Sequence, residues 1–104
     1  MITLTKEAAS QIQLSAKQTQ AEGLPLRIAC QRNDKGGLKY ALGFADIEHD
    51  ADLHFNSEGI DIVVAPTSLD LVDNMVIDYV ELDTGEKDFI FKNPNDPNFA
   101  PPQA

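Results

Sequence analysis

The sequence predicts one small, mainly β domain of the α+β class, with a helix at its start and one short helix inside. Its 104 residues, 42% of them hydrophobic, suffice for a single core. Apolar and polar residues alternate along several stretches, as they do in half-buried strands. We expect one domain over residues 1–95, followed by a flexible Pro-rich tail over residues 96–104.

The first element expected is a helix. Thr5 is a suitable N-cap, Glu7 places a negative charge in the first turn, and Gly23 is expected to terminate the helix. The apolar stripe of this helix is thin and consists of Ala8, Ile12 and Ala16. Such a helix is expected to lie on a sheet rather than to fill a core.

From Pro25 the apolar period changes to two, which predicts strands. Leu26, Ile28 and Cys30 alternate with polar or small residues, and the pattern returns over residues 38–44. The stretch RNDKGG, residues 32–37, lies between these two strands and is expected to form their connecting loop.

The second half of the chain predicts further strands and one short helix. A short strand is expected at residues 53–55 and another at 60–64, where Pro66 ends it. Thr67, with Asp70 three residues later, predicts a capping box for a short helix that reaches Val72. Two more strands are expected on either side of a hairpin turn at residues 83–86.

The charge balance excludes one class of partner. The formal net charge is −9, and the eight basic residues are spread along the chain, with no cluster longer than a dipeptide spacing. Because nucleic acids are held largely through phosphate contacts from Lys and Arg, we expect no direct nucleic-acid binding. No stretch approaches the roughly 20 apolar residues of a membrane span, so we expect a cytoplasmic protein without a membrane partner.

Few residues suggest catalysis. Lys35 stands beside Gly36 and Gly37, but a phosphate-binding loop needs an upstream glycine and a Ser or Thr after the lysine. Cys30 alternates in register with apolar residues and is expected to be a small core residue. No pairing of a nucleophile with a base can be defended from the spacing, so we expect no enzyme. An enzyme that uses Lys35 is the weakest hypothesis.

The acidic stretch DIEHDADLH leaves one alternative open. If this stretch is extended, one side carries four carboxylates and an imidazole, those of Asp46, Glu48, Asp50, Asp52 and His54. Such donors could hold iron, zinc or manganese weakly, although their spacing matches no defined metal motif. A solvated turn is the favoured interpretation, and a residual metal carrier is the alternative.

Read end to end, the chain resembles the A-type iron–sulfur carriers, the IscA, SufA and HesB family. The resemblance rests on the order and spacing of four segments: ITLTKEAASQI, LRIACQRNDKGGLKYALGF, GIDIVVAPTSLDLVDNMVIDYVE and FIFKNPN. It implies a compact β-sandwich of mixed sheets with the N-terminal helix packed outside and one short internal helix.

The resemblance also implies that the three cluster-binding cysteines are missing. Aligned without a gap, the loop cysteine of the family falls on Lys35, and the two tail cysteines fall on Ala100 and Pro102. Iron–sulfur clusters rely on soft thiolates, whereas lysine is cationic and alanine and proline donate nothing. We therefore expect the fold without the cluster, and no bound cofactor.

One branch of that family, DsrR, shows the same loss and is encoded with the reverse-type dissimilatory sulfite reductase proteins of sulfur-oxidising bacteria. The resemblance to DsrR implies a non-enzymatic accessory or regulatory protein of sulfur oxidation that acts through a protein partner. The expected docking residues lie in the loop and in the tail, where carriers must meet their partners: Arg32, Lys35, Gly36, Gly37, Asn93 and Phe99.

Overall fold

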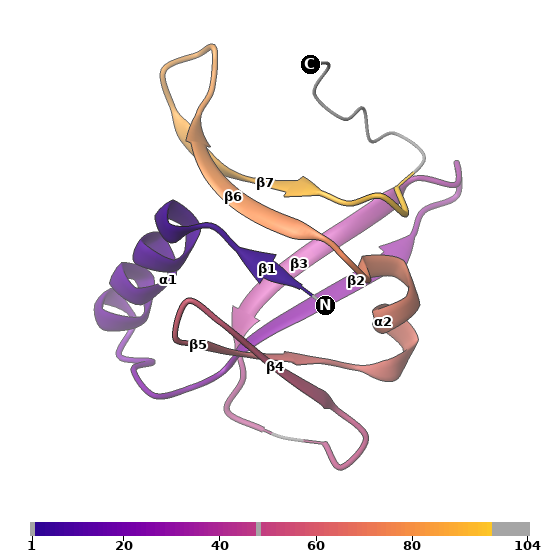
Figure 1. Cartoon of the computed structure of the whole chain (residues 1–104), viewed down its shortest axis with the longest axis horizontal. Helices are drawn as coiled ribbons and strands as arrows, with labels where there is room; N and C mark the ends of the chain where they lie inside the picture. The colour runs from indigo at the N-terminus through magenta and orange to yellow at the C-terminus, as the bar shows by residue number, and fades with distance from the viewer. Residues whose placement is uncertain (1, 48, 97–104) are drawn as a thin grey trace.

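The structure is a computed structural model that describes residues 2–47 and 49–96. These residues form two sheets and two helices (Figure 1). In chain order the elements are β1 (Thr3–Leu4), α1 (Lys6–Gln18), β2 (Leu26–Arg32), β3 (Leu38–Phe44), β4 (Leu53–Ser57), β5 (Ile60–Val64), α2 (Pro66–Val72), β6 (Val76–Glu81) and β7 (Lys87–Lys92).

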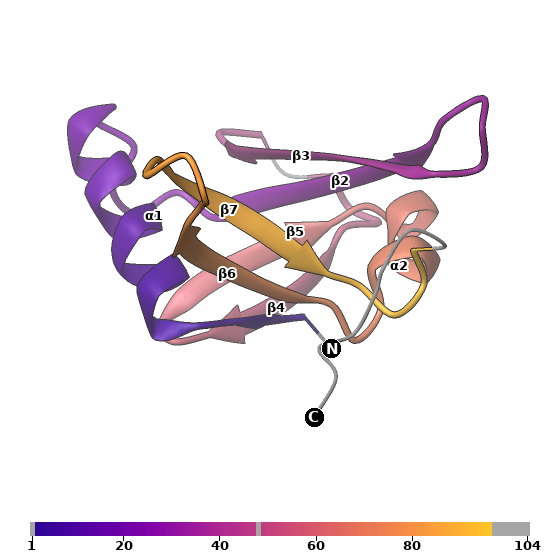
Figure 2. The ribbon, with the colours of Figure 1, turned by 90° about the horizontal axis from the view of Figure 1, so that it is seen from above.

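Both sheets are mixed. The larger sheet has the strand order β3-β2-β5-β4, in which β2 is antiparallel to β3 and parallel to β5. The smaller sheet has the order β1-β6-β7, in which β1 is parallel to β6 and β7 is antiparallel to it. Figures 1 and 2 show α1 at one end of the sheets and α2 at the other. The predicted mixed-sheet architecture with one N-terminal and one short internal helix is confirmed.

The hydrophobic core lies between the two sheets. The alternation expected for β2 is confirmed, because Leu26, Ile28 and Cys30 are at most 3% exposed. From the smaller sheet, Ile77 is fully buried and joins the same cluster. Burial of such aliphatic side chains stabilises a fold by about 1.5–3 kcal/mol each, so the alternation along these strands determines which sheet face is internal.

Helix α1 begins as predicted but ends earlier. The hydroxyl of Thr5 accepts a hydrogen bond from the backbone N–H of Ala8 at 3.2 Å, which confirms the N-cap. The prediction that Gly23 ends the helix is wrong. The helix ends at Gln18, and the next turn is closed by Gln20 with a left-handed φ of 57°. Gln20 therefore adopts the left-handed backbone conformation that ends a helix and that is usually adopted by glycine.

Helix α2 forms where expected but without the predicted capping box. Its N-cap is Ala65, which makes no side-chain capping bond, and Pro66 occupies the first helical turn. The backbone carbonyl of Ala65 accepts from the N–H groups of Ser68 and Leu69. Proline already has the φ of a helix and has no N–H to satisfy there, so Thr67 falls inside the helix rather than at its cap.

The short strand β1 was not predicted. The backbone N–H of Thr3 donates to the carbonyl of Met75, and that of Thr5 donates to the carbonyl of Ile77. Between them, the N–H of Leu4 donates to the hydroxyl of Ser57 on the other sheet at 2.9 Å. The first residues of the chain therefore connect both sheets.

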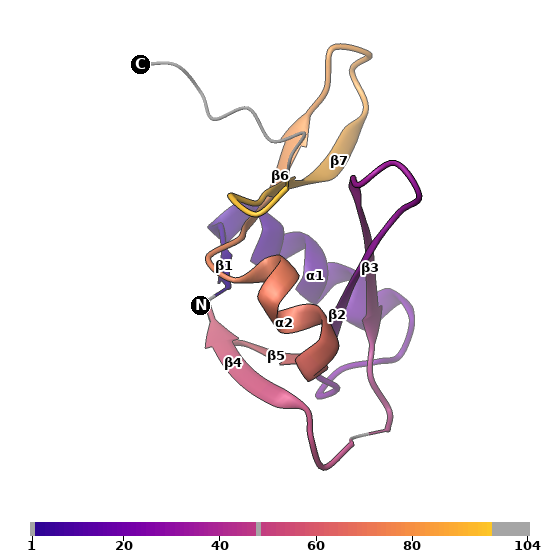
Figure 3. The same cartoon turned by 90° about the vertical axis from the view of Figure 1, so that its right-hand side faces the viewer.

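The predicted hairpin turn between β6 and β7 is confirmed. The backbone N–H of Leu82 donates to the carbonyl of Glu86 at 2.7 Å, and Gly85 has a φ of 86°, which only glycine adopts without strain. Figure 3 shows this hairpin extending beyond both helices. No helix within residues 2–47 and 49–96 is long and apolar enough to cross a membrane.

Candidate functional site

The loop between β2 and β3 carries Lys35 at an exposed position. The side chain of Asn33 organises this loop, because its Oδ1 accepts from the backbone N–H groups of Lys35 at 3.0 Å and Gly37 at 2.9 Å. Gly36 has a φ of 81°, and its N–H donates to the carbonyl of Asn33. The loop is therefore a defined turn that presents Lys35 to solvent rather than a phosphate cradle.

Cys30 occupies the core beneath this hairpin, as the sequence predicts. It is 3% exposed, and its backbone N–H donates to the hydroxyl of Ser68 on α2 at 3.2 Å. Burial raises the pKa of the thiol, and the nearby carboxylate of Asp96 raises it further, while the charge of Arg32 acts in the opposite direction. Cys30 is thus held as a neutral thiol inside the protein.

Asn93 secures the chain after β7. It is fully buried, and its side-chain amide donates to the carbonyl of Leu71 at 2.6 Å and to the hydroxyl of Tyr40 at 3.1 Å. Its Oδ1 accepts from the backbone N–H of Asn95 at 3.0 Å. Because a buried amide needs such partners, Asn93 fixes the path of the chain toward the tail. Its part in docking would be to position neighbouring residues, since its own side chain is covered.

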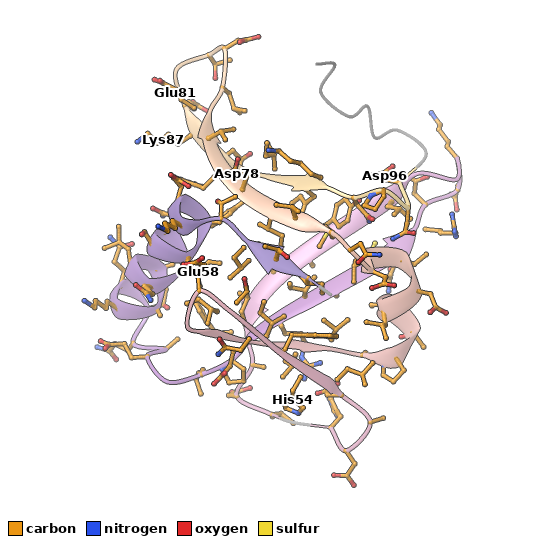
Figure 4. All side chains as sticks on the ribbon, in the orientation of Figure 1. His54, Glu58, Asp78, Glu81, Lys87 and Asp96 are labelled. Atoms are coloured by element: carbon orange, nitrogen blue, oxygen red, sulfur yellow. The ribbon has the colours of Figure 1, made fainter. Side chains whose placement is uncertain are left out.

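Tyr40 joins the two segments that the resemblance singled out. Its hydroxyl donates to Oδ2 of Asp96 at 2.8 Å, and its ring stacks on Phe91 with the centroids 4.5 Å apart. Burial raises the pKa of Tyr40, so the phenol stays protonated and can donate this bond. Tyr40 lies close in sequence to the Lys35 loop, and Figure 4 places Asp96 beside the β2–β3 hairpin.

The loop and the start of the tail therefore meet on one side of the molecule. Arg32, Lys35 and Gly36 are exposed there, whereas Gly37 is buried at the base of the turn. The remaining expected positions, Phe99, Ala100 and Pro102, lie outside the described residues.

The side chains of the acidic stretch, residues 46–54, do not come together at one site. Asp52 is 8% exposed and forms a two-point ion pair with Arg27, whose Nη1 donates to Oδ1 at 3.1 Å and whose Nη2 donates to Oδ2 at 2.6 Å. This pair and the backbone N–H of His49 lower the pKa of Asp52 to about 2. The carboxylate is therefore used to attach the segment after β3 to the sheet, as a buried charge requires.

The other candidate metal ligands do not gather around Asp52. Asp46, His49 and Asp50 are exposed, and Glu48 lies outside the described residues. His54 is exposed on β4, and Figure 4 places it on the opposite side of the molecule from Asp96. Within residues 2–47 and 49–96, no three His, Cys, Asp or Glu side chains come close enough to hold a metal ion together.

The described residues do not fit an iron–sulfur cluster. Lys35 presents an ammonium group at the loop position, and a cation cannot ligate iron. The chain's single thiol, that of Cys30, is enclosed in the core and protonated. Neither group can therefore ligate the iron of a cluster in this fold.

Sequence reasoning missed the residues that hold this site together. The alternation over residues 38–44 predicts no polar partner for Tyr40, and no motif in the sequence singles out Ser68. Each makes its hydrogen bond across more than 30 residues of chain, to Asp96 and Cys30 respectively. The available signal was the tyrosine itself, because a buried phenol needs a hydrogen-bond partner.

Comparison with known proteins agrees with this fold. The family described as iron-sulphur cluster biosynthesis matches residues 1–99. The uncharacterized protein SufA of Bacillus subtilis is 33% identical over 94 residues, which cover 90% of this chain and 78% of that protein. The iron-binding protein IscA of Serratia proteamaculans is 31% identical over 94 residues, 90% of this chain and 86% of that protein.

Solved structures show the same architecture. The crystal structure of IscA with a 2Fe–2S cluster superposes with a TM-score of 0.77 at 29% identity, over 91% of this chain and 86% of that one. Escherichia coli SufA, involved in the biosynthesis of iron-sulfur clusters, gives a TM-score of 0.74 at 28% identity, over 95% and 85%. IscA is thus described as an iron-binding protein and Escherichia coli SufA as a protein of iron-sulfur cluster biosynthesis, and neither description is that of an enzyme. The chain belongs to the iron-sulphur cluster biosynthesis family.

Proposed function

We propose that this protein is a non-enzymatic accessory protein that kept the docking surface of the carrier fold and lost the cluster. The loop around Lys35 and the tail that starts at Asn93 form that surface. The observation that carries the proposal is the bond between Tyr40 and Asp96, which keeps the two segments together although neither Lys35 nor Cys30 can serve a cluster there.

Charge supports docking to an acidic partner. Arg32 and Lys35 are exposed at the end of the β2–β3 hairpin of a protein whose net charge is −9. Local cations on a globally acidic protein steer an acidic surface toward that hairpin and penalise other orientations. The turn bonded by Asn33 holds the loop in one shape, which lowers the entropy lost on binding.

The finer proposal is a DsrR-like regulatory role in cytoplasmic sulfur oxidation. It is supported by the replacement of the family's loop cysteine by Lys35 and by the Pro-rich sequence after Asn93. The residual metal carrier remains the second hypothesis, and no gathering of donors among the described residues favours it.

Partner capture tests the docking site. We would express tagged wild-type protein, a Lys35→Glu variant and a variant that ends at Asn95 in a sulfur-oxidising host, and quantify co-purified proteins and sulfur-oxidation rate. Lys6→Glu, an identical charge change at an exposed position of α1, is the control. Both site variants should lose the same partner and slow sulfur oxidation, while Lys6→Glu should not.

The alternatives give different outcomes. If both folded site variants keep full partner capture and full oxidation rate, the docking site lies elsewhere. If they lose a partner without any effect on sulfur oxidation, docking stands and the sulfur-oxidation role is wrong.

A further inference from the structure

The outer face of the β2–β3 pair is not covered by any helix or strand of the described chain. Figure 2 shows β6 and β7 on the inner side of this pair only. Since Leu26, Ile28 and Cys30 point inward, the intervening residues of β2 point outward with their cross-strand partners. The outward pairs, together with Ile47, define what we call the outer ledge: Arg27 with Gly43, Ala29 with Ala41, and Gln31 with Lys39.

The ledge contains a hollow with an exposed apolar side chain beside it. The hollow has a volume of about 330 Å³, and its lining includes Ala29, Ala41, Gly43 and Ile47. Ile47 is 64% exposed, the most exposed of the large hydrophobic residues described. The same hollow is also lined by Leu42, Phe44 and Ala45, so it offers several apolar side chains to a partner beside the polar side chains of Arg27, Asp46 and His49.

Gly43 makes close approach to this face possible. It lies within β3, where glycine is unfavourable because of its conformational freedom. Its φ is not left-handed, and a Cβ built on it would meet no atom within 4 Å. Neither the backbone conformation nor the packing of the described chain requires glycine here. A partner backbone that lies against this position would require it.

Positive charge gathers at one end of the ledge. Three of the chain's eight basic residues, Arg32, Lys35 and Lys39, lie within one hairpin end, against one acidic residue in the hairpin itself, Asp34, and the carboxylate of Asp96 beside it. Among the described residues, the ion pairs use other cations, those of Arg27 with Asp52 and Lys92 with Asp78. The cations of the hairpin end are therefore available to an acidic partner.

We propose that the outer ledge binds an extended acidic segment of a partner protein. The backbone of that segment lies close to Gly43, one of its apolar side chains fills the hollow beside Ile47, and its carboxylates contact Lys35 and Lys39. A second copy of this chain is a poorer occupant, because two copies with a charge of −9 each repel one another. The choice of an acidic partner rests on the proposed docking function.

The probe is a short synthetic peptide of alternating glutamate and valine, which presents one acidic and one apolar side when extended. Binding is followed by NMR on isotope-labelled protein at ~0.15 M salt, where screening limits the repulsion from distant carboxylates. The peptide should shift the amide signals of Ala29, Ala41, Gly43 and Ile47. A peptide of alternating lysine and valine should not.

Substitutions then test the geometry of binding. Gly43→Val adds a side chain to the open ledge, so it should preserve or raise the melting temperature and weaken peptide binding by about tenfold or more. Lys39→Glu should weaken binding by about tenfold, with Lys6→Glu as its matched control. Thr3→Val, an exposed strand position on the other sheet, is the control for Gly43→Val and should leave binding unchanged.

Several outcomes would contradict the proposal that the outer ledge binds an acidic segment. These are no amide shifts with the acidic peptide, shifts centred elsewhere, equal binding of the lysine peptide, or unaltered binding by folded Gly43→Val. Self-association that shifts the same amides without peptide would assign the ledge to a second copy instead. If Gly43→Val fails to fold, Ile47→Ser replaces it, because a change at a 64% exposed side chain should not disturb the fold. This substitution should weaken peptide binding by about threefold or more.

The proposal for the outer ledge can be wrong while the proposed docking function of the loop and tail is right. If Lys35→Glu and the shortened chain lose a cellular partner while Gly43→Val and Ile47→Ser retain it, the loop and tail are the docking site and the ledge is not. If the peptide binds the ledge but the loop and tail variants keep their cellular partner, the proposed docking site is wrong and the ledge remains.

Discussion

The hydroxyl of Tyr40 donates a hydrogen bond of 2.8 Å to Oδ2 of Asp96, a residue 56 positions further along the chain. The hydroxyl oxygen of Tyr40 also accepts a hydrogen bond from the buried side-chain amide of Asn93 at 3.1 Å. One phenol thus connects the edge strand that leaves the Lys35 loop to the chain that leaves β7. These two hydrogen bonds attach the start of the tail beside the loop.

Removal of that hydroxyl should loosen the tail. Tyr40→Phe keeps the ring that stacks on Phe91 but deletes both hydrogen bonds, so we expect a loss of about 1–3 kcal/mol in the free energy of unfolding. Urea unfolding measures that loss, and hydrogen exchange at Asn95 and Asp96 should become faster.

Tyr79→Phe is the matched control for that substitution. Tyr79 also packs on an aromatic residue, Phe89, but no described residue forms a hydrogen bond with its hydroxyl. Its substitution should change stability by less than about 0.5 kcal/mol. Equal effects of the two substitutions would show that the Tyr40 bonds contribute nothing specific.

The pair of Arg27 and Asp52 should make stability depend on acid pH. The folded pKa of Asp52, about 2, lies below its ordinary value of 3.8, so ionisation of Asp52 stabilises the fold above the ordinary pKa. That stabilisation is lost as the pH falls from about 5 toward 2. The urea midpoint of wild type should therefore fall across this range.

Asp52→Asn tests the assignment. The variant should be less stable than wild type at pH 7, and the difference between the two should shrink as the pH approaches 2. Asp50→Asn, an exposed neighbour, should follow wild type throughout. A constant difference between Asp52→Asn and wild type from pH 7 to 2 would rule out the ion pair as its cause.

The thiol of Cys30 should be inert in the folded protein. Because it is 3% exposed and its pKa is raised, we expect DTNB to react with native protein at least about 100-fold more slowly than with protein unfolded in urea. Cys30→Ala combined with Lys35→Cys moves the single thiol to the exposed loop and should react rapidly. Rapid reaction of native wild type would mean that Cys30 is not enclosed.

Much of the fold could be predicted because it depends on local pattern. The alternation around Ile28 and the hydroxyl of Thr5 each act within a few residues, and both predictions are confirmed. The predicted end of α1 was wrong because Gln20 adopts the left-handed conformation that was expected of Gly23. The predicted start of α2 was wrong because Pro66 occupies the first helical turn, so Thr67 lies inside the helix and cannot cap it.

The parts of the site that could not be predicted depend on pairing across the chain. Nothing near Asp52 in the sequence indicates that Arg27 binds it, so its carboxylate was counted as a candidate metal ligand. In the same way, Asn93 was recognised as part of a motif, but its bond to Tyr40 requires the two sheets to be packed. Strand alternation determines which face is buried, not which buried polar groups meet.

Restored thiols test whether the ancestral arrangement survives. We expect that Lys35→Cys with Ala100→Cys and Pro102→Cys folds and binds iron at least weakly, because Tyr40 and Asn93 keep the loop near the start of the tail. The same triple variant with Tyr40→Phe should bind iron less tightly. Iron binding by spectroscopy and metal analysis checks both, and a folded triple variant that binds none would show that the tail no longer reaches the loop.

The loss of cluster binding is tested most directly by reconstitution of wild-type protein with iron and sulfide under anaerobic conditions. The absorption spectrum is recorded after gel filtration, with Cys30→Ala alongside. With Lys35 in the loop and Cys30 in the core, the wild-type protein should remain colourless and carry no stoichiometric iron or sulfide. A stable visible chromophore that disappears in Cys30→Ala would contradict this, and would make Cys30 a cluster ligand shared between two copies of the chain.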